Sequence, residues 1–533
     1  NDMIHVNIRE GEMKIGQSIR FIEPIDTKIS NISNIPIPNI SISNISNISN
    51  INNEKLHLQD QLKSAYQSGC VFVLLGIPED IGPRANYGRK GSDCGWNAFL
   101  NSFLNIQDNY YMQGDKVLLL GHVICDDLME RSKKYMNNTN TNTTNTNTTT
   151  PTPTPTIGEG NANEQTTVTT QNTQNTQNIQ SNNESNEDNE SSEDNHDRYI
   201  QHLRVLCSEL DSRVSHIMDI VFASQLIPII IGGGHNNCYP IIKSLYKWVN
   251  SDGISGISGN DNVDNNVDIN ITNTTNANNN TTTSNTSTNN TIQTKVQLPV
   301  SVSASVQVNA INLDPHCDYR DPSDGRHSGN GFSTAMRDDY LHYYHVFCMN
   351  EYKNNKFSLQ RMGADGCGVT THQELFHRNC SSSSGKCNTF ECALAKALLD
   401  VTSSRCDDTV TTSTTTNATN TTFNTTTIPN YKSISESNPT PNTNPNTNTV
   451  FGIELDTDVI TNMPVSAYNT CGVSVDTAAN YVHTCALQQR SKYIHICEAS
   501  PCQHPNGVFH GICVAGQIQT TLVTTFMQAK LCI

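Results

Sequence analysis

The sequence of 533 residues lacks several features that define large functional classes. No stretch approaches the ~18 continuous apolar residues of a membrane-spanning helix. Its 33 Lys and Arg residues are outnumbered by 50 Asp and Glu, which gives a formal net charge of −17. A chain with that balance lacks the basic face that a nucleic-acid backbone requires. We therefore expect neither a membrane nor a nucleic acid as a partner.

Apolar residues are also scarce, since 35% of the chain is hydrophobic and 6% is aromatic. The shortage is concentrated in Asn-, Thr- and Ser-rich tracts near 31–53, 137–195, 251–294 and 407–449. Such tracts bury too little apolar surface to offset the entropy of ordering. We expect the last three to be disordered, low-complexity insertions in surface loops, because loop-closure entropy grows slowly with length. Residues 1–53 would form an N-terminal segment, and 54–533 a single domain.

Cysteine occurs 18 times, but never as the Cys-x-x-Cys pair of many zinc and redox sites. The first residues lack the charged and then apolar pattern of a secretory signal. We therefore expect reduced thiols and a cytoplasmic protein.

Short apolar runs are spaced along the chain between the polar tracts. They lie at 71–75, 117–120, 229–231, 310–313, 345–348, 451–455 and 493–497. Runs of this kind are typical of strands buried on both faces of a parallel sheet. Apolar residues from Ile200 to Val221 recur at steps of three and four, which predicts a helix, and Ser474 is the expected N-cap of another. The alternation predicts an α/β fold of three layers, α/β/α, with a mostly parallel central sheet.

Metal-binding residue types follow the predicted strand that ends at Leu313. They are Asp314, His316 and Asp318, within the sequence Asp-Pro-His-Cys-Asp. Alternate residues of an extended chain point to the same side, so the three side chains can converge. Carboxylate oxygens combined with an imidazole nitrogen suit Mn²⁺-like ions. A polar surface loop is the alternative, but the triplet directly follows a buried strand.

Two other strand ends carry residues of the same kind. The run 227–231 leads through three glycines to His235, and the run 451–455 ends in Asp456 and Asp458. Ligands collect beyond the carboxyl ends of parallel strands. Carboxylates packed this densely would take up protons unless cations compensated them. A lone histidine is more often structural, but six ligands with four carboxylates are enough for two metal ions with bridging oxygens.

Two further side chains could act on a substrate. Glu498 follows the predicted strand 493–497 and could pair with a cationic amidine or guanidine. His327 lies in the loop after the Asp-x-His-x-Asp motif and could transfer protons. An ordinary loop histidine is the alternative for His327.

Together the motifs resemble those of the ureohydrolase superfamily, which contains arginases, agmatinases and formimidoylglutamases. The family patterns Gly-Gly-x-His, Asp-Ala-His-x-Asp and Asp-x-Asp correspond here to GGGH at 232–235, DPHCD at 314–318 and DTD at 456–458. The resemblance implies an arginase-like fold, two Mn²⁺ per subunit with other divalent metals able to use the same ligands, and a homo-trimer or homo-hexamer. It also implies that His235 and Asp318 bind one ion, His316 and Asp458 bind the other, and Asp314 and Asp456 bridge them.

Stretches 78–86, 326–333 and 495–498 resemble the formimidoylglutamase branch in particular. That branch implies hydrolysis of N-formimidoyl-L-glutamate to L-glutamate and formamide. A guanidino substrate such as arginine, agmatine or guanidinobutyrate, releasing urea, is the alternative, and a ligand-binding relative without turnover is a third. The expected catalytic residues are Asp318, His327 and Glu498. The expected substrate contacts are Arg84, Asn86, Arg89, Arg326, Ser328 and Asn330.

The chain departs from the family pattern at three positions. Gly234 stands where arginases and agmatinases usually have Asp, which weakens the case for an arginase in particular. Pro315 replaces the usual Ala between two ligands and removes a backbone N–H. Cys317 lies between two ligands, where we expect it to point away from the metals.

Overall fold

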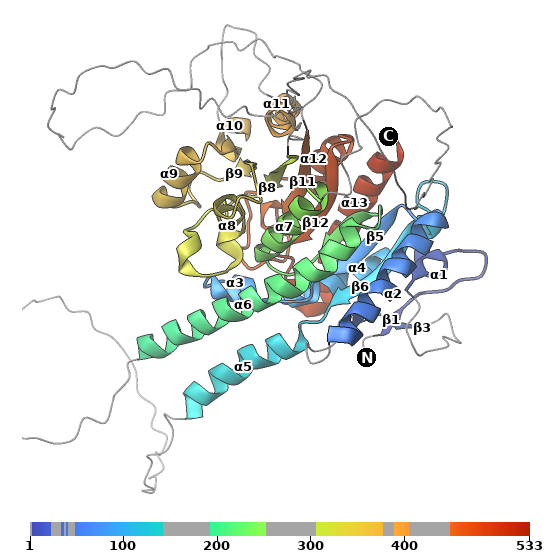
Figure 1. Ribbon diagram of the computed structural model, residues 1–533, viewed down its shortest axis with the longest axis horizontal. Helices are drawn as coiled ribbons and strands as arrows, with labels where there is room; N and C mark the ends of the chain where they lie inside the picture. The colour runs from blue at the N-terminus through green and yellow to red at the C-terminus, as the bar shows by residue number, and fades with distance from the viewer. Residues whose placement is uncertain are drawn as a thin grey trace, which may run out of the picture.

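The computed structural model describes residues 3–22, 34–36, 39–40, 48–141, 192–251, 305–376, 389–403 and 448–533 (Figure 1). Most of the predicted insertions at 137–195, 251–294 and 407–449 lies outside these residues. At their edges, α5 (Asp126–Thr141) and α6 (Ser192–Phe222) extend into the first insertion, and α2 (Ile48–Gln67) begins inside the polar N-terminal tract. Helices extend this way because lengthening a formed helix is easier than nucleating a new one.

Ten strands of the described chain form one sheet in the order β10-β9-β8-β11-β12-β7-β5-β6-β2, with β4 beside β6. Each strand pairing in this sheet is parallel. All seven predicted strands are confirmed: β5 (Phe72–Gly76), β6 (Val117–Val123), β7 (Ile227–Ile231), β8 (Gln307–Leu313), β9 (Tyr343–Met349), β11 (Thr449–Asp456) and β12 (Ser491–Cys497).

Short strands were not predicted from the sequence. They are β2 (Arg20–Phe21), β4 (Asn39–Ile40) and β10 (Gly368–Thr371) at the sheet edges, and the separate antiparallel pair β1 (Met3–His5) and β3 (Asn34–Pro36). Strands of two to four residues are too short to show a hydrophobic period.

Helices cover both faces of the sheet (Figure 1). One face packs against α4 (Gly95–Phe103), α11 (Phe390–Thr402), α12 (Val475–Ala486) and α13 (Val508–Leu531). The other packs against α2, α5, α6, α7 (Cys238–Val249), α8 (Gly331–Arg337) and α9 (Lys356–Ala364). The short helices α1 (Ile15–Ser18), α3 (Ile81–Ala85) and α10 (His372–Phe376) complete the described α-helices. The predicted helix over 200–221 is α6, and Ser474 Oγ caps α12 by accepting from Thr477 N.

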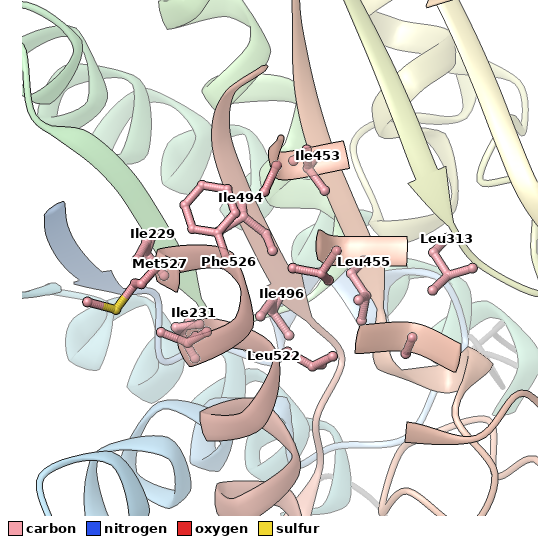
Figure 2. Close-up of a cluster of buried hydrophobic side chains, with 14 of the residues drawn as sticks. Ile229, Ile231, Leu313, Ile453, Leu455, Ile494, Ile496, Leu522, Phe526 and Met527 are labelled. Atoms are coloured by element: carbon pink, nitrogen blue, oxygen red, sulfur yellow. The ribbon is translucent and has the colours of Figure 1, made fainter. Parts of the chain in front are cut away.

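Two apolar layers result from the alternation of side chains along each strand. Ile229 and Ile231 of β7 pack with Phe526 of α13 (Figure 2), whereas Ile230 belongs to the opposite layer. Both faces of the strands are therefore buried, which explains their nearly continuous apolar sequences. The predicted three-layer α/β/α architecture with a parallel sheet is confirmed.

The order of the strands gathers the predicted site at one edge of the sheet. Strands β8, β11, β12 and β7 are consecutive neighbours and all parallel. Their carboxyl ends lead to Asp314, Asp456, Glu498 and His235 respectively. Among the helices of the described residues, none combines the length and apolar character needed to cross a membrane.

Candidate metal centre

A glycine turn after β7 places His235 at the sheet edge. Gly232 and Gly233 have φ values of +91° and +74°, the left-handed region that glycine adopts without strain. A Cβ on Gly233 would lie 2.6 Å from the side-chain nitrogen of Asn237. Glu79 Oε1 holds the turn by accepting from Gly234 N at 2.7 Å and Asn237 Nδ2 at 2.8 Å. Glu79 is fully buried and was not predicted as part of the site.

Three carboxylates surround the Nδ1 atom of His235. It lies 2.8 Å from Asp318 Oδ2, 3.3 Å from Asp314 Oδ2 and 3.4 Å from Asp456 Oδ2. One potential ligand atom from each of these four residues lies within 4.8 Å of the others, close enough to hold one metal ion.

A second group adjoins the first and shares a residue with it. His316, Asp456 and Asp458 also offer ligand atoms within 4.8 Å of one another. His316 Nδ1 lies 3.8 Å from Asp458 Oδ2 and 3.5 Å from Asp314 Oδ1. Asp456 therefore belongs to both groups, and the two oxygens of Asp314 face one histidine each. The structure brings together all six residues that the sequence suggested as metal ligands.

Backbone hydrogen bonds orient the carboxylates. Asp314 Oδ1 accepts from His316 N at 2.6 Å, and Asp456 Oδ1 accepts from Asp458 N at 2.7 Å. Asp318 adopts a φ of +44°, a strained conformation for a residue other than glycine. Strain of this kind persists where the surrounding structure over-determines it, often at functional sites.

The closely packed carboxylates of the site repel one another. Burial and the neighbouring Asp314 raise the pKa of Asp318, and the same two causes raise the pKa of Asp456 to about 6. Burial and Asp456 raise the pKa of Asp458 well above its usual value. For Asp314, burial opposes ionisation, but the adjacent imidazoles outweigh it and lower the pKa. Bound cations would relieve this repulsion.

Buried polar atoms without hydrogen-bond partners also fit a cation site. Neither ring nitrogen of His235 makes a hydrogen bond of good geometry within the described residues, although Nδ1 faces three carboxylates, and Asp458 Oδ1 also lacks a partner there. Leaving such atoms unsatisfied is unfavourable in a buried site. The donor set of four carboxylates and two imidazoles is of the kind that Mn²⁺ and similar ions prefer.

A cavity of about 190 Å³ opens onto the carboxylates. Its wall includes His316, Asp318, Asp456, Asp458 and Glu498 on the proposed metal side, and Pro83, Asn86, Gly88, Cys317, Arg320, Ser328, Lys353, Asn354, Asn355, Ser358, Ser466 and Ala467 elsewhere. Cys317 therefore borders the cavity, but it belongs to neither ligand group. Arg320 and Lys353 were not predicted from the sequence. Arg320 follows Asp318 by two residues, a spacing that could have suggested it.

Glu498 lies at the junction of cavity and metal groups. Its φ of +65° turns the chain sharply at the end of β12. Its Oε1 accepts from the backbone N–H of His235 at 2.9 Å. Burial and the charge of Asp456 raise the pKa of Glu498 well above its usual value. A cationic group in the cavity would favour the ionised form.

His327 is buried and does not line this cavity. Its Nδ1 accepts from Gly329 N at 3.1 Å and so caps the 3₁₀ turn Ser328–Asn330. Burial and the nearby Arg204 lower the pKa of His327 to about 3.

Of the six expected substrate contacts, Asn86 and Ser328 line the cavity and the other four do not. Arg84 bonds to Asp80, Tyr199 and Ser132. Arg326 is buried, where it bonds to Asp211 and to Asn330 Oδ1, and it lies over the ring of Tyr239. Arg89 is exposed. The half-buried Arg84 and the buried Arg326 thus hold neighbouring elements together.

No protein-family model matches the chain, and no curated protein matches it. Solved structures do match the chain. The similarity is to structures of the arginase superfamily. A Trypanosoma cruzi formiminoglutamase with Mn²⁺ is 13% identical, with a TM-score of 0.44 over 88% of this chain and 98% of that chain. A Bacillus subtilis formimidoylglutamase is 10% identical, with a TM-score of 0.45 over 87% and 88%. A hypothetical agmatinase from Burkholderia thailandensis is 10% identical, with a TM-score of 0.43 over 87% and 88%.

A buried network that the sequence did not suggest adjoins the two ligand groups. Glu454, two residues before Asp456 on β11, has Oε2 at 2.7 Å from His495 Nδ1 and at 3.6 Å from His235 Nε2. Tyr493 donates its hydroxyl to Glu454 Oε1 at 2.6 Å. Burial opposes ionisation of Glu454, but His495 and His235 outweigh it and lower its pKa to about 2. Glu454 thus supports His235 from the side opposite the three aspartates.

Proposed function

We propose that the chain is a metal-dependent hydrolase of the ureohydrolase superfamily that cleaves a C–N bond in a linear amidine. The proposed substrate is N-formimidoyl-L-glutamate, and the products are L-glutamate and formamide. The observation that carries this proposal is the pair of ligand groups that share Asp456 and that both reach the cavity lined by Glu498.

Two divalent cations fit the residues present. His235, Asp314, Asp318 and Asp456 would hold one, and His316, Asp456 and Asp458 the other, with Asp314 facing both histidines. When bound, such cations supply a nucleophile near neutral pH by lowering the pKa of water. We assign Mn²⁺, which the resemblance implies, and other divalent metals could use the same ligands.

Glu498 binds the cationic end of the substrate in this proposal. Its Oε1 is held by His235 N, which leaves Oε2 to accept from an amidinium N–H. Hydrogen bonds between an ionised donor and an ionised acceptor are roughly twice as strong as neutral ones. The formimidoyl carbon would then lie next to the carboxylate groups, where attack on it is proposed.

Hydrolysis gives the oxygen of water to the formimidoyl carbon and a proton to the leaving glutamate nitrogen. The sequence suggested Asp318 and His327 for proton transfer. We assign it to Asp318, which lines the cavity, whereas His327 lies outside the cavity wall with its Nδ1 occupied.

The cations of the cavity wall favour an anionic substrate. Arg320 and Lys353 line the cavity together with the amide side chains of Asn86, Asn354 and Asn355. N-formimidoyl-L-glutamate carries two carboxylates besides its amidinium, whereas agmatine carries only cationic groups. We propose that Arg320 and Lys353 bind a substrate carboxylate, since guanidinium and ammonium groups pair with carboxylates.

A substrate panel tests the proposal. Protein purified with Mn²⁺ would be assayed with formimidoylglutamate, arginine, agmatine, guanidinobutyrate and guanidine for released formamide, urea and ammonia. We expect formamide from the first substrate alone, and loss of that activity in Asp314→Ala. Urea from a guanidino compound would move the assignment to the alternative. Two bound metals without turnover would indicate an untested amidine, and absence of metal would favour a ligand-binding relative.

A further inference from the structure

A second set of potential ligand atoms includes His235 but no residue of the cavity wall. His495 and Cys497 are two residues apart on β12, so their side chains share one face of the sheet. One atom each from His235, His495 and Cys497 lies within 4.8 Å of the others, and all three residues are fully buried. Cys497 and His495 have no part in the proposed hydrolysis.

His495 is oriented as a metal-binding histidine usually is. Its Nδ1 bonds to Glu454 Oε2 at 2.7 Å, and Glu454 is fixed in turn by the hydroxyl of Tyr493. A carboxylate on one ring nitrogen commonly fixes the tautomer of a ligating histidine and leaves the other nitrogen for the metal. His495 Nε2 has no hydrogen-bond partner among the described residues, although the residue is fully buried.

The chemistry of this set differs from that of the aspartate groups. Two imidazole nitrogens and a thiolate suit Zn²⁺ and similar borderline or soft ions, whereas carboxylates suit harder ions. In a tetrahedral zinc site, bond lengths of about 2.0–2.3 Å place the ligand atoms roughly 3.4–3.8 Å apart. The three potential ligand atoms all lie within 4.8 Å of one another, so small side-chain adjustments bring them to that spacing.

We propose that His235, His495 and Cys497 form a binding site for an ion of the Zn²⁺ class, which shares His235 with the neighbouring aspartate groups. On binding, the Cys497 thiol gives up its proton to solvent, and the thiolate becomes the ligand. Because His235 belongs to both sets, ions in the two sites compete for its imidazole and repel one another across it. Ions of the Zn²⁺ class and ions bound by the aspartates therefore weaken one another's binding.

Cobalt spectroscopy tests the site independently of catalysis. Co²⁺ bound to a thiolate gives a charge-transfer absorption in the near ultraviolet that carboxylate and imidazole ligands do not give. Titration of the metal-free full-length protein with Co²⁺ should produce this absorption, and excess Mn²⁺ should reduce it. The absorption should be lost in Cys497→Ser and reduced at least tenfold in His495→Gln at equal Co²⁺. It should persist in Cys485→Ser, whose cysteine is equally buried on α12.

An absorption in Cys497→Ser as strong as in the parent protein would overturn the proposal, and so would its equal loss in Cys485→Ser. Circular dichroism would verify that each variant is folded. X-ray absorption at the zinc edge, measured on the unmodified protein, tests the site without any substitution. One sulfur neighbour of bound Zn²⁺ is expected, and a shell of nitrogen and oxygen alone would contradict the site.

Discussion

The backbone N–H of His235 donates a 2.9 Å hydrogen bond to Oε1 of Glu498. The turn that presents a metal-ligand candidate is thereby tied to the carboxylate proposed to hold the substrate. Both residues follow neighbouring strands, β7 and β12. Movement of either strand end would disturb both metal binding and substrate binding. Substitutions that keep the geometry are therefore needed to distinguish these two functions.

Glu498→Gln makes this separation, because the amide oxygen can still accept from His235 N while the charge is lost. Truncating one partner of a buried charge pair costs about 2–5 kcal/mol. We therefore expect kcat/KM for formimidoylglutamate to fall by at least ~30-fold, with the bound Mn²⁺ unchanged. Steady-state kinetics and metal analysis check this. Unchanged kinetics at full metal content would remove Glu498 from substrate binding.

Asp456 is the one aspartate of the described groups that belongs to both ligand sets. Asp456→Asn should lose both metal ions, whereas Asp458→Asn should lose only one, because Asp458 belongs to one set. Metal content after dialysis against a fixed free Mn²⁺ concentration measures the difference. Equal stoichiometry in the two variants would show that Asp456 is not shared.

The cavity cations should determine how tightly a carboxylate-bearing substrate binds. Arg320→Ala and Lys353→Ala should each raise KM roughly tenfold or more, since a hydrogen bond to a charged group contributes about 1.5–3 kcal/mol. Arg84→Ala is the matched control, because Arg84 bonds to Asp80 and Ser132 outside the cavity wall. It should lower Tm and leave KM close to that of the parent protein. A KM effect confined to Arg84→Ala would reverse the assignment.

The raised pKa of Asp456, about 6, makes the stability of the metal-free protein depend on pH. The folded state binds this proton more tightly than the unfolded state, whose aspartates titrate near pH ~4. Stability of the metal-free protein therefore falls as pH rises from about 4 to about 6, and the full loss is present at neutral pH. Bound Mn²⁺ should restore this lost stability.

Thermal unfolding with and without Mn²⁺ measures this effect. At 100 times its Kd, one bound ion contributes ~2.7 kcal/mol, which corresponds to a rise in Tm of roughly 5–10 °C. The rise should be present at pH 7.5 and should shrink toward pH 5, where protons compete for the same carboxylates. An equal rise at both pH values would contradict the linkage.

Much of the fold and most of the proposed metal ligands could be predicted from the sequence, because both depend on local patterns. A strand such as β7 is buried on both faces and is therefore apolar throughout. The Asp314–Asp318 motif is compact and directly follows such a strand. Short edge strands such as β10 give no pattern of this kind.

The contacts of the arginine side chains could not be predicted, since they depend on partners far away in the chain. Arg326 adjoins His327, which suggested a substrate contact, but its partner Asp211 lies 115 residues earlier on α6. Lys353 comes to the cavity from the segment after β9, with no motif around it. Glu454 likewise lies within an otherwise apolar strand and has no motif around it. Its role depends on the pairing of β11 with β12.

The central claim is that this chain holds two metal ions that share Asp456, and anomalous diffraction tests it most directly. A crystal grown with Mn²⁺ would be measured above the manganese absorption edge. We predict two peaks a few Å apart, one among His235, Asp314, Asp318 and Asp456 and the other among His316, Asp456 and Asp458. A single peak, or none at saturating Mn²⁺, would contradict the two-metal site.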